Sequence, residues 1–148
     1  MTVRFTGVEE EMVCPYLILH GSSAEGLAVE FARRTGCTLG YVEIRHFPDG
    51  ERYVRVHDDV KDRRVILFQS LHHRPDPLLF ELMLLYDTLN DLGAEEVVPV
   101  IPYFAYARQD ERFKPGEAIS IRSVAKMLEA VGMREIYTVD MHLHRVTE

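Results

Sequence analysis

Apolar segments of strand length alternate along this chain with longer segments whose apolar residues recur at helical spacing. This alternation is typical of a parallel sheet covered by helices. It predicts an α/β fold with a mainly parallel sheet and helices on both faces. The predicted strands are residues 16–19, 65–69, 97–101 and 136–139, and the predicted helices are residues 24–35, 76–92 and 121–131. Because Pro99 has no amide donor, its strand is expected at a sheet edge or in an irregular pairing.

The predicted helices carry start and stop signals. Ser22 and Glu25 have the spacing of a capping box, in which the two side chains satisfy free amides of the first turn. Asp76 followed by Pro77 predicts the start of the second helix. Ser120 is the predicted cap of the third helix. A glycine ends each predicted helix, namely Gly36, Gly93 and Gly132.

A β-hairpin is predicted between the first helix and the second buried strand. Residues 40–46 and 52–57 are extended in pattern, and residues 47–51 join them. The joining segment contains Asp49-Gly50, which is a strong hairpin signal because both turn positions favour positive φ. The hairpin is therefore expected as an insertion in the parallel fold.

Size and charge limit the domain organisation and the partners. The chain has 148 residues, of which 47% are hydrophobic. Such a chain fits one compact domain spanning residues 1–148, which buries roughly two-thirds of its unfolded surface. The net charge is −7, which argues against the broad basic face that nucleic acids bind. No nucleic-acid partner is expected.

No segment has the pattern of a membrane span or a secretory signal. The apolar runs are far shorter than the roughly 18 residues that a bilayer span requires. The amino terminus lacks a basic segment followed by an apolar core. We therefore expect no membrane partner and a cytoplasmic location. In that setting, Cys14 and Cys37 are expected to be reduced packing residues without a catalytic role, although a pairing between them is the alternative.

Loops that follow the predicted strands carry the candidate site. In an open parallel sheet, loops at the carboxyl ends of strands gather at one edge and bind ligands there. The loops that qualify are residues 20–23, 104–116 and 140–144. Arg108 and Gln109 lie in the second, and Asp140 and His142 in the third. Arginine makes bidentate contacts with phosphate oxygens, while carboxylate and imidazole can hold a divalent ion. These residues suit a polyphosphate with its metal, and ordinary solvated loops are the alternative.

Phe47, Asp49 and Glu51 alternate in the segment that joins the hairpin strands. In extended backbone, alternate residues point the same way, which would place an aromatic ring and two carboxylates on one side. An adenine base would stack on the ring, and a carboxylate would accept a hydrogen bond from its amino group. The alternative is that residues 47–51 form only a turn.

Four segments of the sequence stand out together: "HGSSAEGLAVEFARRTG", "FPDGERYVRV", "IPYFAYARQDERFKPGEAISIRSVAKML" and "TVDMH". They resemble segments of the ribose-phosphate diphosphokinase family, the phosphoribosyl pyrophosphate synthetases, of the archaeal type. The segments cover nearly the whole chain in the order of that family. The resemblance implies a phosphoribosyltransferase-like fold with a β-hairpin insertion.

The resemblance also implies a reaction. It is transfer of the β,γ-diphosphoryl group of ATP, with Mg²⁺, to the anomeric hydroxyl of ribose 5-phosphate, which gives phosphoribosyl pyrophosphate and AMP. Such chemistry depends mainly on positioning and on neutralising charge at the phosphate oxygens. The residues implied to contact ATP are Arg108 and Gln109 after the aromatic strand, and Phe47, Asp49, Gly50 and Glu51 in a loop on the adenine side.

The resemblance further implies a metal site and a subunit contact. His142 matches the histidine at the metal and the triphosphate, and Asp140 lies beside it. The loop that carries Phe47 reaches into the ATP site of a neighbouring subunit in the family, so a homodimer or a higher homo-oligomer is expected.

The similar region corresponds only to the first of the family's two domains. The ribose-phosphate loop, a metal-binding aspartate and the mobile loop with the catalytic lysine and arginine belong to the second. No catalytic residue is therefore expected in this chain, and the chain alone is not expected to catalyse the reaction. The main alternative is a non-catalytic module that binds a nucleotide or a subunit and modulates a full-length synthetase. A flavodoxin-like signalling domain is a weaker alternative, because it gives no reason for Arg108-Gln109 after an aromatic strand.

Overall fold

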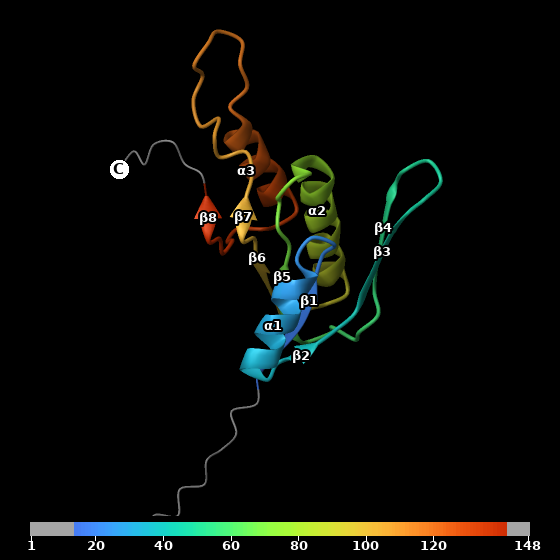
Figure 1. Cartoon of the computed structure of the whole chain (residues 1–148). Helices are drawn as coiled ribbons and strands as arrows, with labels where there is room; N and C mark the ends of the chain where they lie inside the picture. The colour runs from blue at the N-terminus through green and yellow to red at the C-terminus, as the bar shows by residue number, and fades with distance from the viewer. Residues whose placement is uncertain (1–13, 142–148) are drawn as a thin grey trace, which may run out of the picture.

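The computed structural model describes residues 14–141, and a parallel sheet forms the centre of this region (Figure 1). Its strand order is β2-β1-β5-β6, with every neighbouring pair parallel. The strands are β1 (Tyr16–His20), β2 (Thr38–Leu39), β5 (Arg64–Phe68) and β6 (Glu96–Val100). Pro99 lies in β6, which is an outer strand of this sheet, as its missing amide predicts.

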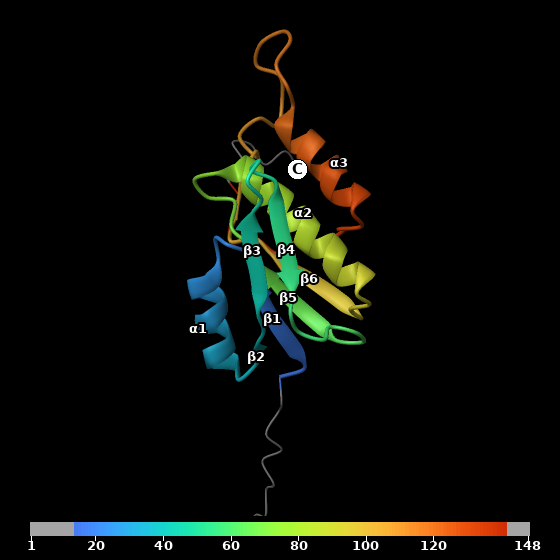
Figure 2. The same ribbon diagram turned by 90° about the vertical axis from the view of Figure 1, so that its right-hand side faces the viewer.

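Helices cover both faces of the sheet, as predicted (Figures 1 and 2). Successive strand residues point to opposite faces, so Ile18 packs against Ala28 of α1 while Leu17 packs on the side of α2. The helices are α1 (Glu25–Thr35), α2 (Pro75–Asp91) and α3 (Ser120–Ala130), and α3 joins the larger core on the α2 side. Among the described residues, no helix has the length and apolar character needed to cross a membrane.

The capping predictions were wrong for these helices, because none of them receives a side-chain hydrogen bond at its N-cap. The hydroxyl of Ser22 donates to Glu81 of α2 instead of to α1. α2 begins at Pro75, so Asp76 lies within its first turn, and Ser120 lies inside α3. In contrast, the glycines end the helices as predicted, with left-handed φ of +69° at Gly36, +86° at Gly93 and +85° at Gly132.

The predicted hairpin is present and packs on α2. Its strands, β3 (Val42–His46) and β4 (Arg52–Val56), are antiparallel with Val42 opposite Val56. Figure 1 shows α2 between this hairpin and α3. Apolar side chains of both strands join the larger core, namely Val42, Ile44, Val54 and Val56.

The hairpin turn differs in type from the prediction. The amide of Gly50 donates to the carbonyl of Phe47 at 2.9 Å, and the amide of Phe47 donates to the carbonyl of Glu51 at 2.9 Å. Gly50 has φ +94°, whereas Asp49 does not have positive φ. The reason is Pro48, whose ring fixes a negative φ at the first turn position and so favours a longer turn with glycine at its end.

The predicted strand at residues 136–139 was wrong. Tyr137 forms only an isolated bridge with Val100, and regular pairing resumes between β7 (Tyr103–Phe104) and β8 (Asp140–Met141). The facing segment contains Pro99 and Pro102, which have no amide to donate, so a continuous ladder is interrupted there.

The expectation of reduced cysteines was also wrong, because Cys14 and Cys37 form a disulfide with a Cα–Cα distance of 4.8 Å. Cys14 lies just before β1, and Cys37 just before β2. Those strands are parallel neighbours, with Leu17 opposite Thr38, so the fold brings the two cysteines together. The expectation of reduced cysteines rested on the predicted cell compartment. The compartment does not indicate whether the fold brings Cys14 and Cys37 together.

Candidate functional site

Arg108 and Gln109 follow the end of β7 in a tight turn, as the loop prediction requires. Arg108 is exposed and Gln109 is half-buried. The Ser120 hydroxyl at the start of α3 donates to Oε1 of Gln109 at 3.1 Å. Gln109 is therefore held by α3, while the guanidinium of Arg108 remains accessible to a ligand.

A strained residue shapes this turn. Tyr106 has φ +71°, a left-handed conformation that is uncommon for a bulky side chain. Its hydroxyl donates to the carboxylate of Asp76 in the first turn of α2. The contact ties the Arg108 turn to α2, and strained backbone of this kind clusters at functional sites.

Asp110 is a candidate that sequence reasoning missed. Its Oδ1 is buried and has no hydrogen-bond partner among the described residues. Buried polar atoms are nearly always satisfied, so this oxygen points to a ligand, an ion or water. The available signal was its position directly after Gln109.

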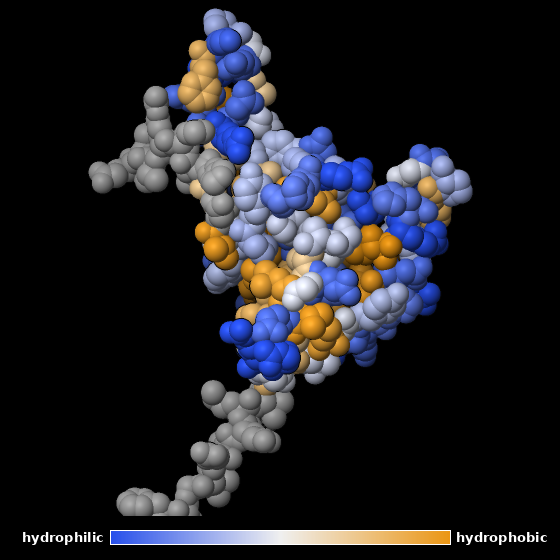
Figure 3. All heavy atoms as spheres, in the orientation of Figure 1, coloured by the Kyte–Doolittle hydropathy of each residue, from blue (hydrophilic) through white to orange (hydrophobic). Residues whose placement is uncertain are grey.

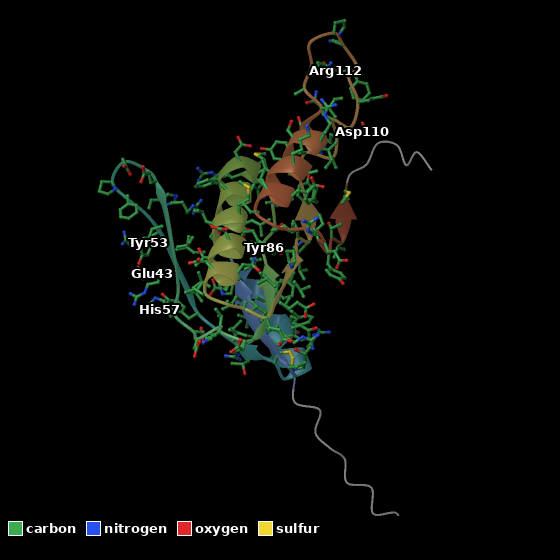
Figure 4. All side chains as sticks on the ribbon, turned by 180° about the vertical axis from the view of Figure 1, so that it is seen from behind. Glu43, Tyr53, His57, Tyr86, Asp110 and Arg112 are labelled. Carbon is green, nitrogen blue, oxygen red and sulfur yellow. A yellow bond between two sulfur atoms is a disulfide. The ribbon has the colours of Figure 1, made fainter. Side chains whose placement is uncertain are left out.

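The charged loop that begins at Asp110 is held together by hydrogen bonds between its own residues. The carboxylate of Glu117 accepts from the amides of Phe113 and Lys114, and Nε of Arg112 donates to the Glu117 carbonyl at 2.9 Å. Figure 3 shows this loop projecting from the body with a mostly hydrophilic surface. Arg112 and Asp110 lie on it in Figure 4.

The pocket at Arg108 is small. Its volume is about 170 Å³, whereas sites for drug-sized ligands and cofactors occupy about 300–1,000 Å³. This volume suits a fragment such as a phosphate group better than a complete nucleotide. The lining residues are Tyr103, Phe104, Tyr106, Ala107, Arg108, Gln109 and Ser120.

The segment predicted to supply metal ligands reaches the same edge. Asp140 pairs with Tyr103, and Met141 with Phe104, so β8 lies beside the strand that leads to Arg108. His142 lies outside the described residues. No group of three or more potential metal-binding side chains occurs within residues 14–141.

The hairpin residues lie in a turn, so the extended alternation considered for Phe47, Asp49 and Glu51 is not present. Oδ1 of Asp49 accepts from the amide of Glu51 at 3.1 Å, which uses part of that carboxylate in the turn. Phe47 remains 40% exposed.

Two neighbours that the sequence reasoning missed support Phe47. The guanidinium carbon of Arg45 lies 5.0 Å from the Phe47 ring centroid and 3.9 Å from that of Tyr53. Phe47 and Tyr53 pack edge to face with centroids 5.7 Å apart. Arg45 and Tyr53 are cross-strand partners, so the hairpin register was the available signal. The three side chains form an aromatic surface supported by a cation.

The tip of the hairpin lies apart from the loop between β7 and α3, which carries Arg108 and is called the Arg108 loop. Within one chain, α2 lies between the two (Figures 1 and 4). In Figure 4, Tyr53 of the hairpin and Arg112 of the loop lie on opposite sides of the molecule. Within one copy of the described chain, the hairpin therefore lies away from the loop that carries Arg112.

The loop after β1 is fixed by buried side chains. The amide of Ser22 donates to Glu81 at 2.6 Å, and the hydroxyl of Ser23 donates to Gln69 at 2.7 Å. Gln69 and Glu81 are both fully buried. A Cβ added to Gly21 would overlap the side-chain amide of Gln69, which is fully buried and hydrogen-bonded, so the loop packs against Gln69 without room for a side chain.

Replacing Gly21 with alanine is therefore expected to lower the free energy of unfolding by about 1–3 kcal/mol, as overpacking does. Urea unfolding followed by circular dichroism measures this. Gly26→Ala is the matched control, because Gly26 is exposed in the first turn of α1 and nothing lies within 4 Å of its added Cβ; its stability is expected to change by no more than about 0.5 kcal/mol. Equal stability of the Gly21→Ala and wild-type chains would contradict the close packing.

Comparison with known proteins identifies the family. A family described as the N-terminal domain of ribose phosphate pyrophosphokinase matches residues 16–132 of this chain. The chain belongs to this family. The ribose-phosphate pyrophosphokinase of Saccharolobus solfataricus is 40% identical over 126 residues, which are 85% of this chain and 43% of that protein. That of Methanothermobacter thermautotrophicus is 44% identical over 132 residues, covering 89% of this chain and 46% of the relative.

A solved structure supports the fold of this ribose-phosphate pyrophosphokinase domain. It is similar to phosphoribosylpyrophosphate synthetase from Mycobacterium smegmatis, with a TM-score of 0.81, 27% identity, and coverage of 88% of this chain and 44% of that chain. The predicted family and α/β fold class are thus confirmed. The domain spans less than half the length of these relatives.

Proposed function

We propose that this domain is the ATP-binding part of a ribose-phosphate diphosphokinase. The observation that carries the proposal is the exposed guanidinium of Arg108, next to Gln109, at the edge where β7 and β8 end together. Ligands of parallel α/β sheets bind at this edge, and arginine suits phosphate oxygens. The family likeness supplies the reaction class.

In the proposed reaction, the anomeric oxygen of ribose 5-phosphate forms a bond to the β-phosphorus of ATP. The bond from that phosphorus to the oxygen bridging it to the α-phosphate breaks, that oxygen leaves with AMP, and the proton of the hydroxyl is released to solvent. Arg108 binds the phosphate chain, and Gln109 is positioned beside it by Ser120. Their contribution is to hold the ATP phosphates in place and to balance their charge.

The proposed metal is Mg²⁺, held by Asp140 and His142. Oxygen atoms are the ligands that Mg²⁺ prefers, and Asp110 adds a buried carboxylate oxygen without a hydrogen-bond partner among the described residues. The carboxylates of Asp140 and Asp110 are donors of the type that this ion prefers, whereas His142 would offer an imidazole nitrogen. When bound, Mg²⁺ neutralises charge on the phosphate oxygens.

The proposed assembly is a homo-oligomer in which the hairpin completes the site of a neighbouring copy. Phe47 offers an aromatic ring that is 40% exposed, with Asp49, Gly50 and Glu51 beside it for the adenine side. The separation of the hairpin tip and the Arg108 loop within one chain (Figure 4) supports this arrangement. The small volume of the Arg108 pocket supports it as well.

Arg108→Ala is expected to weaken ATP binding about 10- to 150-fold, because a hydrogen bond to a charged group contributes about 1.5–3 kcal/mol. Calorimetric titration with ATP, with and without Mg²⁺, measures the change. Arg33→Ala is the control, since it removes the same charge from the exposed end of α1. Equal ATP affinities of the Arg108→Ala and wild-type chains would show that Arg108 does not bind ATP.

The isolated 148-residue chain is expected to bind ATP without converting it to AMP. The ribose 5-phosphate site is proposed to lie mostly in the second domain of the relatives. The assay is AMP release in the presence of ATP, Mg²⁺ and ribose 5-phosphate, with a full-length relative as the positive control. Turnover near the rate of that control would contradict this part of the proposal.

A further inference from the structure

Glu81, in the middle of α2, is a fully buried carboxylate. Both of its oxygens are used. Oε1 accepts from the amide of Ser22 at 2.6 Å and from Nε2 of Gln69 at 2.8 Å. Oε2 accepts from the Ser22 hydroxyl at 2.9 Å and lies 2.8 Å from Nη1 of Arg52. Burial of an ionised carboxylate is tolerated only with such compensation.

These contacts join segments that are far apart in the sequence. Ser22 belongs to the loop after β1, Gln69 follows β5, and Arg52 is the first residue of β4. Glu81 therefore connects the hairpin to two loops at the carboxyl edge of the sheet. The side chain of Arg52 is itself only 11% exposed, so its largely buried guanidinium also requires a partner, and Glu81 supplies one.

The Arg52–Glu81 ion pair lies at the end of the hairpin that carries the turn. Arg52 is opposite His46 in the last pair before the turn, and the turn contains Phe47 and Gly50. The other contacts of the hairpin with α2 include apolar packing, which is non-directional. A charge-assisted hydrogen bond has a preferred direction. The Arg52–Glu81 ion pair therefore fixes the position of the turn relative to α2, whereas apolar packing alone would allow the turn to shift.

We infer that Glu81 is a positioning residue, which through Arg52 sets the place of the hairpin turn relative to the loop after β1. The inference rests on the proposed function, because that turn carries the residues proposed to face the nucleotide of a neighbouring copy. Glu81 acts on the nucleotide only through the hairpin.

The test is hydrogen–deuterium exchange on the double variant Arg52→Met/Glu81→Gln. Replacing a buried ion pair with neutral residues of similar shape is often neutral for global stability, and the introduced glutamine amide retains an oxygen for the Ser22 amide. Exchange of the hairpin amides, including those of Phe47 and Gly50, is expected to be about tenfold faster or more through local opening. The amides of β1 and β5 are expected to change less than about twofold.

Two further variants sharpen the result. Arg52→Lys keeps the charge and is expected to keep most of the hairpin protection. Arg55→Met removes an exposed arginine from the same strand and is expected to leave the exchange unchanged. Unchanged hairpin exchange in the double variant would overturn the inference. Acceleration by the same factor in the hairpin, β1 and β5 would also overturn it, because that is the result of a purely structural role.

ATP titration of the same variants separates this inference from the proposed function. Faster hairpin exchange with weaker ATP binding supports both. Faster exchange with unchanged ATP affinity supports the positioning role and removes the hairpin from the nucleotide site. Unchanged exchange overturns the positioning role whatever the affinity, while the Arg108→Ala titration still decides the nucleotide site.

Discussion

Replacing Glu81 with alanine is expected to lower the free energy of unfolding by about 3–5 kcal/mol, the usual loss when one partner of a buried ion pair is removed. The substitution leaves the guanidinium of Arg52 without its carboxylate at a site where the side chain is 11% exposed. It also removes the acceptor for Ser22 and Gln69. This large effect is distinct from that of the charge-neutral double variant, which retains an amide in place of the carboxylate.

Urea unfolding monitored by circular dichroism measures the loss. Asp87→Ala is the matched control, because Asp87 is an exposed carboxylate on the same helix, and surface substitutions usually stay within about 0.5 kcal/mol. A Glu81→Ala chain with a loss as small as that of the control would show that Glu81 is not paired in solution as in the structure.

Reduction of the Cys14–Cys37 disulfide is expected to lower the free energy of unfolding by about 3 kcal/mol. The two residues are separated by 23 positions, and closing a loop of this length restricts the unfolded chain by about that amount. The bond also ties the segment before β1 to the short outer strand β2. Local loosening should therefore be greatest at β2.

Paired unfolding experiments with and without a thiol reductant measure this effect. The Cys14→Ala/Cys37→Ala chain is the control, because its stability should be low under both conditions and independent of the reductant. If the unmodified chain unfolds at the same urea concentration in both conditions, and mass analysis confirms that reduction occurred, the stabilising role of the disulfide is wrong.

Local patterns in the sequence predicted most of the elements. Apolar periodicity located the central strands and all the described helices, and glycines with left-handed φ ended those helices. Pro99 correctly indicated an outer strand. The predictions failed where a contact with a distant residue determined the local structure. Pro102 faces residues 136–139, so these residues do not form the predicted strand. Ser22 hydrogen-bonds to Glu81 instead of capping α1.

The candidate site also contains residues that the sequence predicted and residues that it did not. Arg108 and Gln109 were predicted as site residues from their position after an aromatic strand, and in the structure they follow β7, which pairs with β8; their role in binding stays a prediction. Asp110, Tyr106 and Arg45 were not among the predicted site residues. Their significance depends on an unsatisfied oxygen, a left-handed φ and a contact with a ring across the hairpin, and none of these is visible in residue spacing.

The amino-acid order by itself determined the α/β pattern and the hairpin, because backbone preferences and the side-chain period act over a few neighbouring residues, and its four characteristic segments identified the family. Only the tertiary structure decided that Cys14 meets Cys37 and that Glu81 meets Ser22, 59 residues away in the chain. Those contacts exist because parallel strands and packed helices bring remote segments within bonding distance, where burial makes each polar group require a partner.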